Sequence, residues 1–197
     1  MASTLSVPHH LNLSDLLSGP LPTAVILATP SPFHVSQAML IIPLGIHVLI
    51  EKPLCNSSQE VASLLEISRQ PGAGTILVGF HRRFNPYVLR LKSILAGQTS
   101  LGPSPIGTPL AFNGLWCTRK PASYFCDVPW RQSLTTGGGV ILTNLSHELD
   151  LMTFLLGPIY RVYAECGSKT RGYDVDETVA ITLKFTSGCV GTYIISE

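Results

Sequence analysis

Three short apolar runs, each ended by a proline or a polar turn, constrain the fold of this chain most strongly. A continuous apolar run of this length is typical of a strand that is buried on both faces of a parallel sheet. The runs occupy residues 23–29, 46–50 and 75–79, and helix-like segments follow them at residues 34–40, 58–69 and 85–95. Strands that alternate with helices in this way predict a parallel, doubly wound α/β sheet.

Two helix starts in this region carry recognisable capping residues. Ser57 is followed three residues later by Glu60, which is the capping-box pattern. Asn85 stands directly before Pro86, a favourable N-cap followed by a first-turn proline. Gly72 and Gly74 resemble part of a nucleotide-binding loop, but they precede a strand instead of following one, so we do not assign them to a cofactor.

The composition of the chain changes after Gly97. A stretch rich in Gly, Pro and Ser up to Pro109 is typical of a domain linker. The pattern then predicts a helix over residues 137–156 and strands over residues 110–118, 159–166, 178–185 and 189–196, the last two joined by a turn at Thr186–Gly188. We therefore expect an α/β plus α+β chain. Residues 1–97 would form a partial Rossmann-type domain, and residues 98–197 part of a substrate and oligomerisation domain with an open, mostly antiparallel sheet.

Composition excludes several classes of protein. Hydrophobic residues make up 45% of the chain and charged residues 13%, a balance that is incompatible with a disordered chain. A formal charge of +1 gives no field that would favour nucleic acid, and no apolar run reaches the roughly 20 residues of a membrane span. Five scattered cysteines show no zinc-ligand spacing, so we expect no metal site and buried free thiols. The chain is expected to be soluble and cytoplasmic.

Polar residues follow the first two predicted strands at the point where each ends. Thr29, Pro30 and His34 follow the first strand, and Glu51-Lys52-Pro53 follows the second. Ligands of open α/β sheets bind outside these carboxyl ends, and a partly desolvated lysine can act as an acid, a base or a hydrogen-bond donor. The structural alternatives are a loop with a capping histidine and a solvated loop lysine.

A second group of candidate residues lies later in the chain. Arg82 and Arg83 follow the third predicted strand and suit phosphate or hydroxyl recognition, although surface ion pairs are the more frequent role of arginine. Trp130-Arg131 precedes three glycines, Gly137–Gly139, which would permit close approach of the backbone to a ligand. On the helix that follows, three residues share one face and include a possible proton donor or acceptor: Thr143, Asn144 and His147. A core histidine without a chemical role is the alternative for the last of these.

In this order and spacing, the segments resemble the glucose-fructose oxidoreductase / inositol dehydrogenase / MocA family over about residues 15–197. The residues that carry the resemblance are Ala28-Thr29-Pro30 with His34, Glu51-Lys52-Pro53, Gly79-Phe80 with Arg82-Arg83-Phe84-Asn85-Pro86, Trp130-Arg131, Gly137-Gly138-Gly139 with His147 and Asp150, and Phe154-Leu155-Leu156-Gly157. Each motif alone is a weak signal.

The resemblance implies a Rossmann-type domain that binds NAD or NADP, a second domain with a large open sheet, and homo-oligomers formed through that sheet. It implies hydride transfer to or from a sugar, cyclitol or related small molecule, with Lys52 at the reacting oxygen and His147 as the acid/base. The cofactor would be bordered by Thr29, Pro30, His34, Glu51, Lys52, Pro53, Trp130 and Arg131, and the substrate by Lys52, Arg82, Thr143, Asn144 and His147. We expect Lys52 and His147 to converge on one cleft.

The sequence also departs from the family pattern. It contains no strand–GxGxxG–helix unit, and Thr143 stands four residues before His147, where the family often has aspartate. The expected sheet is incomplete at Glu197, so we expect segments on both sides of this sequence to complete the enzyme. Two further hypotheses therefore stay open: a non-catalytic, small-molecule-binding or regulatory protein, and an interaction protein whose exposed sheet pairs with another subunit.

Overall fold

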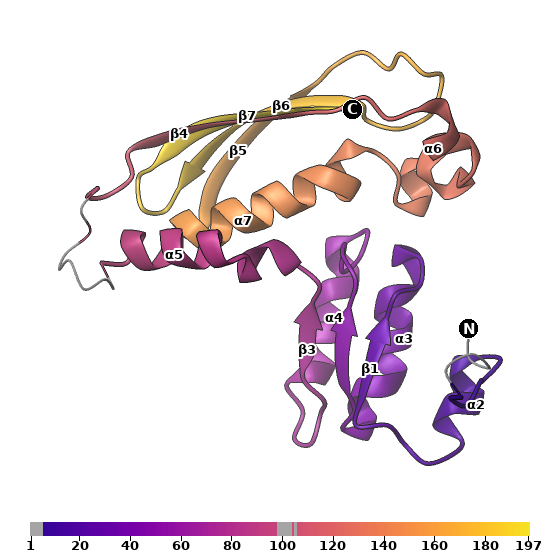
Figure 1. Ribbon diagram of the computed structural model, residues 1–197. Coiled ribbons are helices and arrows are strands. Elements are labelled where there is room, and N and C mark those ends of the chain that lie inside the picture. The colour runs from indigo at the N-terminus through magenta and orange to yellow at the C-terminus, as the bar shows by residue number, and fades with distance from the viewer. Residues whose placement is uncertain (1–5, 98–103, 105) are drawn as a thin grey trace. The chain divides into compact units, whose positions relative to one another are not determined.

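The computed structural model describes residues 6–97, 104 and 106–197 and divides into two compact units, Met1–Gly79 and Phe80–Glu197 (Figure 1). The sequence placed a domain boundary after residue 97. By its contacts, however, α5 (Pro86–Leu95) belongs to the second unit. Most of the linker expected up to Pro109 falls outside the described residues.

The first unit is built on a three-stranded parallel sheet, as expected. The strands β1 (Ala24–Leu27), β2 (His47–Ile50) and β3 (Ile76–Val78) follow one another in space in the order β1-β2-β3. β1 pairs with β2 from Ala24↔His47 to Leu27↔Ile50, so both strands end at the same level. The carboxyl ends of the strands therefore share one edge of the sheet.

Helices α3 (His34–Ile41) and α4 (Ser58–Ser68) pack against this sheet and bury its core, while α2 (Leu13–Leu17) precedes β1. The buried cluster consists of Leu27, Val35, Ala38, Ile41, Ile42, Ile46, Val48, Ile50 and Leu64. The alternate strand positions are open: Ile26 is 68% exposed and Leu77 is 52% exposed. The expectation that these strands are buried on both faces is therefore wrong for this unit, because the described helices cover one face.

The two predicted helix caps have different outcomes. α5 begins as expected, because the side chain of Asn85 accepts a hydrogen bond from the Tyr87 N–H at 2.9 Å. α4 also begins where the sequence placed it, but the Ser57 side chain makes no capping hydrogen bond, and Glu60 Oε2 is buried without a hydrogen-bond partner. The capping box is therefore wrong, although the helix boundary is right.

The second unit contains a four-stranded mixed sheet of β4 (Ala111–Cys117), β5 (Ile159–Cys166), β6 (Thr178–Phe185) and β7 (Val190–Ser196). The order is β4-β7-β6-β5, in which β4 pairs with β7 in parallel and the other two pairs are antiparallel. The expected open, mostly antiparallel sheet is confirmed. The hairpin turn is confirmed too, since Gly188 has a φ of +91° and its N–H donates to Phe185 O at 3.0 Å.

The expected helix over residues 137–156 begins later and less regularly than predicted. The chain makes a π-helical turn over Ile141–Leu145 and then α7 over Ser146–Leu156. The short helix α6 (Ala122–Cys126) was not predicted. Short 3-10 helices also occur at Ser31–Phe33, Ile42–Leu44, His81–Phe84, Pro129–Gln132 and Leu134–Thr136.

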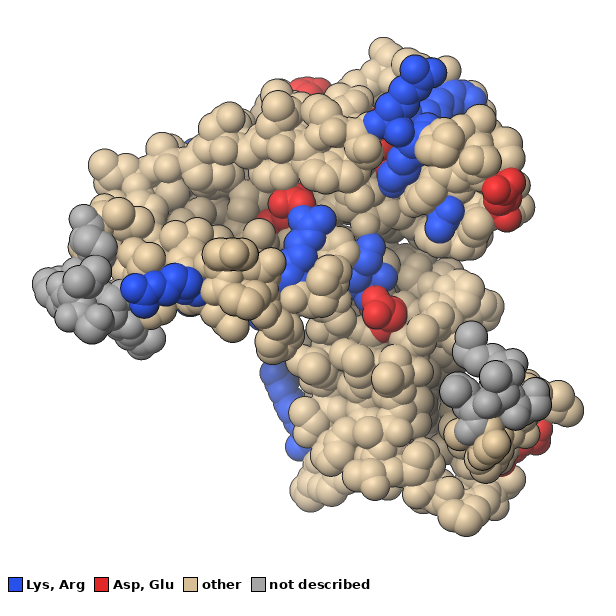
Figure 2. Space-filling model, viewed as in Figure 1, with Lys and Arg blue, Asp and Glu red and all other residues tan. Residues whose placement is uncertain are grey.

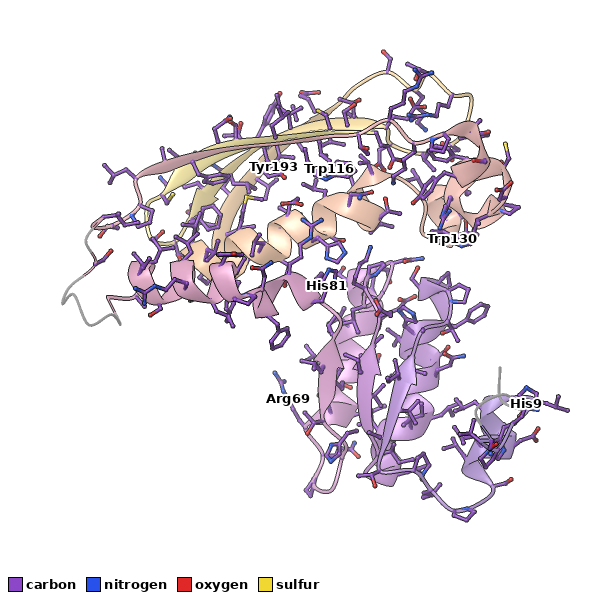
Figure 3. All side chains as sticks on the ribbon, viewed as in Figure 1. His9, Arg69, His81, Trp116, Trp130 and Tyr193 are labelled. Atoms are coloured by element: carbon purple, nitrogen blue, oxygen red, sulfur yellow. The ribbon has the colours of Figure 1, made fainter. Side chains whose placement is uncertain are left out.

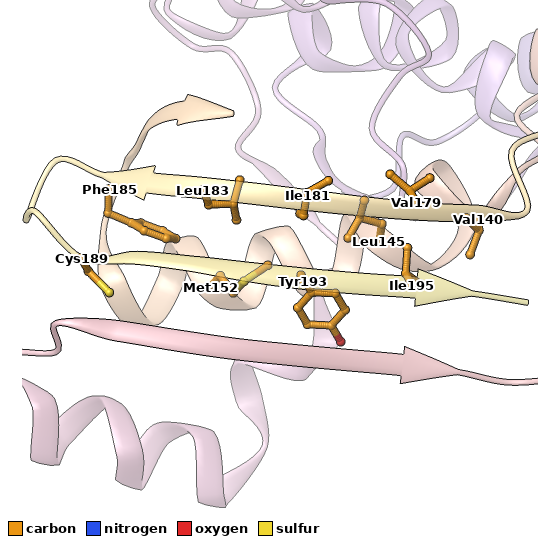
Figure 4. Packing of buried hydrophobic residues seen from close by; sticks show 10 residues of the cluster. All are labelled: Val140, Leu145, Met152, Val179, Ile181, Leu183, Phe185, Cys189, Tyr193 and Ile195. Atoms are coloured by element: carbon orange, nitrogen blue, oxygen red, sulfur yellow. The ribbon is translucent and has the colours of Figure 1, made fainter. Parts of the chain in front are cut away.

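The core of the second unit lies between the sheet and α7 (Figure 4). It is formed by Val140, Leu145, Met152, Val179, Ile181, Leu183, Phe185, Cys189, Tyr193 and Ile195. Trp116 packs against this cluster, and Figure 3 shows Trp116 and Tyr193 on the side of the sheet that faces α7. The sheet is thus covered on one face by the helix whose start carries the candidate site residues.

Two expectations from composition meet different outcomes. Among the described helices, none is both long and apolar enough to cross a membrane. All five cysteines are free, but only Cys189 is buried, whereas Cys117, Cys126 and Cys166 are exposed. The expectation of buried thiols is therefore wrong for these three, which lie at the ends of β4, α6 and β5.

Candidate functional site

The carboxyl edge of the first sheet brings the first two motifs together. The Glu51 N–H donates to Leu27 O at 2.9 Å, and the Gly79 N–H donates to Ile50 O at 2.7 Å, so the ends of the strands are joined by backbone hydrogen bonds. Thr29, Pro30 and Glu51 are exposed at this edge. The edge is therefore accessible to a ligand of the first unit.

His34 lies beneath this edge and joins its two loops. The ring is buried, with 1% exposed, and its Nδ1 lies 2.9 Å from Pro53 O while Nε2 lies 2.7 Å from Thr29 O. Both ring nitrogens thus lie at hydrogen-bond distance from carbonyl oxygens of the chain itself, and each N–H that the ring carries donates to one of them. This geometry favours the role of a clasp that holds the loops after β1 and β2, and its predicted contact with a cofactor stays a prediction.

Lys52 stands at the centre of this edge and is half-buried. Its N–H faces Glu51 Oε2 at 3.3 Å, and its peptide bond to Pro53 is cis. A Cβ atom added to Gly79 would lie 3.3 Å from Glu51 Oε2, so the glycine leaves room for this carboxylate. The loop after β2 therefore carries a carboxylate, on Glu51, and an ammonium group, on Lys52, at neighbouring positions of the chain.

The residues at this edge fit the end of a dinucleotide that approaches a parallel sheet, because exposed polar groups follow β1 and β2 there. No glycine-rich turn that would cradle a pyrophosphate follows any strand of the described part of the first unit. Gly74 does not supply one: a Cβ there would lie 1.9 Å from Ile46 O, so this glycine lets the chain pass strand β2.

In the second unit, His147 lies on α7 and is buried, with 7% exposed. Two rings surround it: that of Phe80, with a centroid distance of 6.1 Å, and that of His81, at 5.2 Å, both edge-on. Figure 3 shows His81 beside α7. Thr143 and Asn144 precede His147 by one helical turn and lie within the π-helical turn, and both are half-buried. The three predicted substrate residues of this helix therefore lie together.

The two arginines after β3 are engaged by acidic residues of α7. Arg82 forms an ion pair with Glu148, and Arg83 Nε donates to Asp150 Oδ2 at 2.8 Å. The hydrogen bond with Asp150 raises the pKa of Arg83 further above its ordinary value. Ion pairing is thus the role that the structure gives to these arginines, and substrate binding by Arg82 stays a prediction.

Glu148 was missed by the sequence analysis, and it also faces the sheet. Burial raises the pKa of the Tyr193 hydroxyl well above its ordinary value, and the neighbouring Glu148 carboxylate raises it further. Tyr193 therefore stays neutral and acts as a hydrogen-bond donor beside this carboxylate. In the sequence, only the i, i+1 relation to His147 pointed to Glu148.

Arg131 and Trp130 lie next to α6. Arg131 Cζ stands 3.9 Å from the centre of the Tyr124 ring and 5.4 Å from that of Trp130, and Arg131 Nη1 donates to Tyr124 O at 2.9 Å. Trp130 itself is 37% exposed, so its indole is accessible. The pair forms a cation–π stack within the second unit, and its predicted contact with a cofactor stays a prediction.

Two of the three glycines before α7, Gly138 and Gly139, accommodate the chain itself, which corrects the expectation that they admit a ligand. A Cβ at Gly138 would lie 2.6 Å from Arg131 O, and one at Gly139 would lie 2.6 Å from Asp176 Oδ1. Asp176 Oδ2 accepts a hydrogen bond from the Ile141 N–H at 2.7 Å. This carboxylate therefore occupies the helix start that was assigned to a ligand. No local pattern pointed to it, because Asp176 lies 35 residues after Ile141.

Charge and metal-ligand chemistry add two observations. The face of the molecule in Figure 2 carries small, separate groups of both signs. Among the described residues, no group of three His, Cys, Asp or Glu side chains is placed to hold a metal ion.

Lys52 lies in the first unit and His147 in the second, so their expected convergence on one cleft stays a prediction.

Comparison with known proteins identifies the relatives of this chain. Residues 1–80 match the profile of an oxidoreductase family with an NAD-binding Rossmann fold, and residues 104–197 match that of the GFO/IDH/MocA C-terminal domain. The uncharacterized oxidoreductase YrbE of Bacillus subtilis is 28% identical over 89% of this chain and 49% of its own length. Inositol 2-dehydrogenase of Streptomyces avermitilis is 30% identical over 75% of this chain and 38% of its own length. The chain thus spans about half, or less, of these relatives.

Solved structures show the same fold. The WlbA dehydrogenase of Chromobacterium violaceum, solved with NADH and UDP-GlcNAcA, has a TM-score of 0.88 at 24% identity and is matched over 99% of this chain and 55% of its own. GenD2 from gentamicin A biosynthesis, solved with NAD, has a TM-score of 0.82 at 25% identity, over 99% of this chain and 54% of its own. The expected nicotinamide cofactor is confirmed at the level of the family. The two profiles together cover most of the sequence, and the chain belongs to the GFO/IDH/MocA family of NAD-binding oxidoreductases.

Proposed function

We propose that the protein to which this chain belongs oxidises a secondary alcohol, or reduces the corresponding carbonyl, on a sugar, a cyclitol or a related small molecule. The observation that carries this proposal is the position of Lys52, a half-buried lysine at the carboxyl edge of a parallel sheet in a family of NAD-binding oxidoreductases. The name of one relative, inositol 2-dehydrogenase, supports a polyol substrate. NAD or NADP supplies the hydride acceptor or donor when bound.

The chain contributes hydrogen bonding and proton transfer. The Lys52 ammonium group donates a hydrogen bond to the reacting oxygen, which favours negative charge on that oxygen as the proton leaves. The His147 imidazole holds the proton of the substrate hydroxyl, because histidine exchanges a proton near neutral pH. Thr29, Pro30, Glu51 and Pro53 border the cofactor.

Kinetics of the whole protein test the proposal. The measurement is NADH formation with a panel of polyols, including myo-inositol and D-glucose, by the wild type and by Lys52→Met and His147→Asn. Loss of a general acid/base is expected to lower kcat by about 10²- to 10⁴-fold. Arg90→Gln, a change at an exposed residue of α5, is the control and is expected to leave kcat unchanged. Unchanged kcat in both site variants contradicts the assignment.

A cofactor titration tests this chain by itself. Enhancement of NADH fluorescence is expected on mixing, because the carboxyl edge of the first unit is accessible. No binding at millimolar NADH or NADPH would remove the cofactor from the function of the isolated chain.

Two observations favour a second function: no glycine-rich turn follows the described strands of the first unit, and Thr143 stands where an acidic residue is frequent in the family. A non-catalytic protein that binds a polyol without a cofactor would have these features. Binding of myo-inositol in the absence of nucleotide, with no turnover in its presence, would support this function.

We further propose that the protein works in the cytoplasm as a homo-oligomer associated through its open sheet and that it does not bind nucleic acid. The outward face of this sheet carries Leu115, Tyr163 and Ile194, which are 67%, 63% and 43% exposed. Light scattering tests the association, and a monomer at micromolar concentration contradicts it. Leu115→Lys is expected to shift the equilibrium towards monomer.

A further inference from the structure

Lys120, which no motif pointed to, is engaged by three acceptors within the second unit. Its ammonium group forms an ion pair with Glu197, donates to Asn144 Oδ1 at 2.9 Å and donates to the Tyr124 hydroxyl at 3.2 Å. The side chains of Lys120 and Glu197 are 13% and 2% exposed. The ion pair and the two hydrogen bonds anchor this ammonium group within the second unit. Lys120 is therefore held in place beside Asn144.

This contact determines which way the side-chain amide of Asn144 points. Lysine only donates hydrogen bonds, so the amide oxygen must face it and the amide nitrogen must point away. Among the described residues, Lys120 and the Thr143 hydroxyl both bond to the oxygen of this amide. Its two N–H groups therefore point away from Lys120.

Thr143 gives weaker support to the same orientation. Its hydroxyl lies 2.7 Å from Gly139 O and 2.9 Å from Asn144 Oδ1. A hydroxyl has one proton, which Gly139 and Asn144 must share. The lysine contact has no such competition, and it therefore decides the orientation.

We propose that Lys120 is a positioning residue that fixes Asn144 as a hydrogen-bond donor to the substrate. The substrate atom that meets Asn144 is then an acceptor: a carbonyl oxygen, a carboxylate oxygen or a lone pair of a hydroxyl group. An aspartate at this site would instead accept. This inference rests on the proposed function for the presence of a substrate, but the orientation of the amide is independent of it.

The orientation is tested in the ligand-free chain. Removing Lys120 alone would leave a buried Glu197 carboxylate without its partner, which threatens folding. The test therefore compares Glu197→Gln, which keeps Lys120 beside Asn144, with Lys120→Met/Glu197→Gln, which loses both charges. The measurement is the side-chain amide signal of Asn144 in a ¹H–¹⁵N spectrum, assigned by its loss in Asn144→Ala.

We expect this signal to keep its position in Glu197→Gln and to move in Lys120→Met/Glu197→Gln. Lys120→Arg, which also only donates, is expected to restore the position. The inference is overturned if the Asn144 signal is the same with and without Lys120.

The role towards substrate is tested with two probes, myo-inositol and D-glucuronate, titrated into the same proteins. Loss of Lys120 is expected to weaken binding roughly three- to tenfold, the effect of one misdirected hydrogen bond. In an Asn144→Ala background the same loss is expected to have no further effect, because Lys120 acts through Asn144.

An equal weakening in both backgrounds overturns the positioning role. If neither probe binds to any of these proteins, the proposed substrate class fails. The ligand-free spectra then still decide whether Lys120 orients the amide.

Discussion

At the scale of single residues, contacts between distant parts of the chain decide which side chains are available for chemistry. Arg82, Arg83, Gly138 and Gly139 were candidates for ligand contact, and other parts of the chain contact each of them. The acidic partners of the two arginines, Glu148 and Asp150, lie 66 and 67 residues away. The identity of the partner could not be predicted, because it depends on the tertiary fold.

Gly139→Ala is expected to destabilise the second unit. The residue has a φ of +93°, and a Cβ there would lie 2.6 Å from Asp176 Oδ1, so the change combines backbone strain with a displaced helix cap. A loss of about 2–4 kcal/mol in the free energy of unfolding is expected. Gly172→Ala is the matched control, since its φ is +78° and nothing lies within 4 Å. Equal losses in urea denaturation would show that Asp176 plays no part.

Glu177 is expected to contribute acid-sensitive stability. Burial alone would raise its pKa, but hydrogen bonds from the Thr170 hydroxyl and from the Arg171 and Thr170 N–H groups, with the charge of Arg171, hold the pKa below its ordinary value. The folded-state pKa is therefore lower than the unfolded value of about 4.3. The contribution is complete above that value and is lost as the pH falls through the folded-state pKa.

Glu177→Gln should therefore lower the free energy of unfolding at pH 7 and lose this effect in acid. Urea denaturation of the wild type and of Glu177→Gln, at pH 7 and in acid, measures this difference in the free energy of unfolding. Asp174→Asn, which changes an exposed carboxylate with 75% of its side chain accessible, is the control. A Glu177→Gln effect that does not depend on pH contradicts the pKa argument.

At the scale of elements, periodicity and turn residues predicted most of the helices and strands. The three parallel strands and the hairpin from β6 to β7 are at their expected places. The start of α7 was misplaced, because the glycines that looked helical are packed against Arg131 and Asp176. The π-helical turn at Ile141–Leu145 has no sequence signature of its own. In the candidate site, the shared face of Thr143, Asn144 and His147 was predictable from helical spacing, whereas Lys120 was not.

The two helix caps provide a direct comparison of pattern and contact. Asn85→Ala is expected to cost about 1 kcal/mol of stability, because its side chain caps the Tyr87 N–H. Ser57→Ala is expected to cost close to nothing, since Ser57 makes no such bond. Hydrogen exchange at the first turns of α5 and α4 measures both. A comparable increase in exchange at both helices would show that Ser57 caps α4 in solution.

At the scale of the molecule, the two units have separate cores. The cluster around β1–β3 and the cluster between α7 and β4–β7 share no residue. Composition and alternation predicted two domains of different type, and the family profiles match the chain in two corresponding stretches. The boundary itself was less predictable, because α5 follows a parallel strand in sequence while its contacts belong to the second unit.

Separate cores predict separate unfolding transitions. Ile50→Ala and Leu183→Ala each remove a side chain that is 0% exposed and should each cost about 2–5 kcal/mol. Both tryptophans, Trp116 and Trp130, lie in the second unit. Ile50→Ala should therefore shift the circular dichroism transition and leave the tryptophan fluorescence transition in place. Leu183→Ala should shift the fluorescence transition. A fluorescence shift in Ile50→Ala would mean that the units unfold together.

β4 pairs with β7, which comes much later in the sequence, so the two strands can pair only late in synthesis. Ala111 pairs with Val190, and Cys117 pairs with Ser196, so β4 is translated long before its neighbour exists. The backbone N–H and C=O groups of β4 that pair with β7 stay unpaired until about seventy further residues have been translated. The apolar side chains of β4 are thus uncovered during translation, and this is the period in which a chaperone would engage the nascent chain.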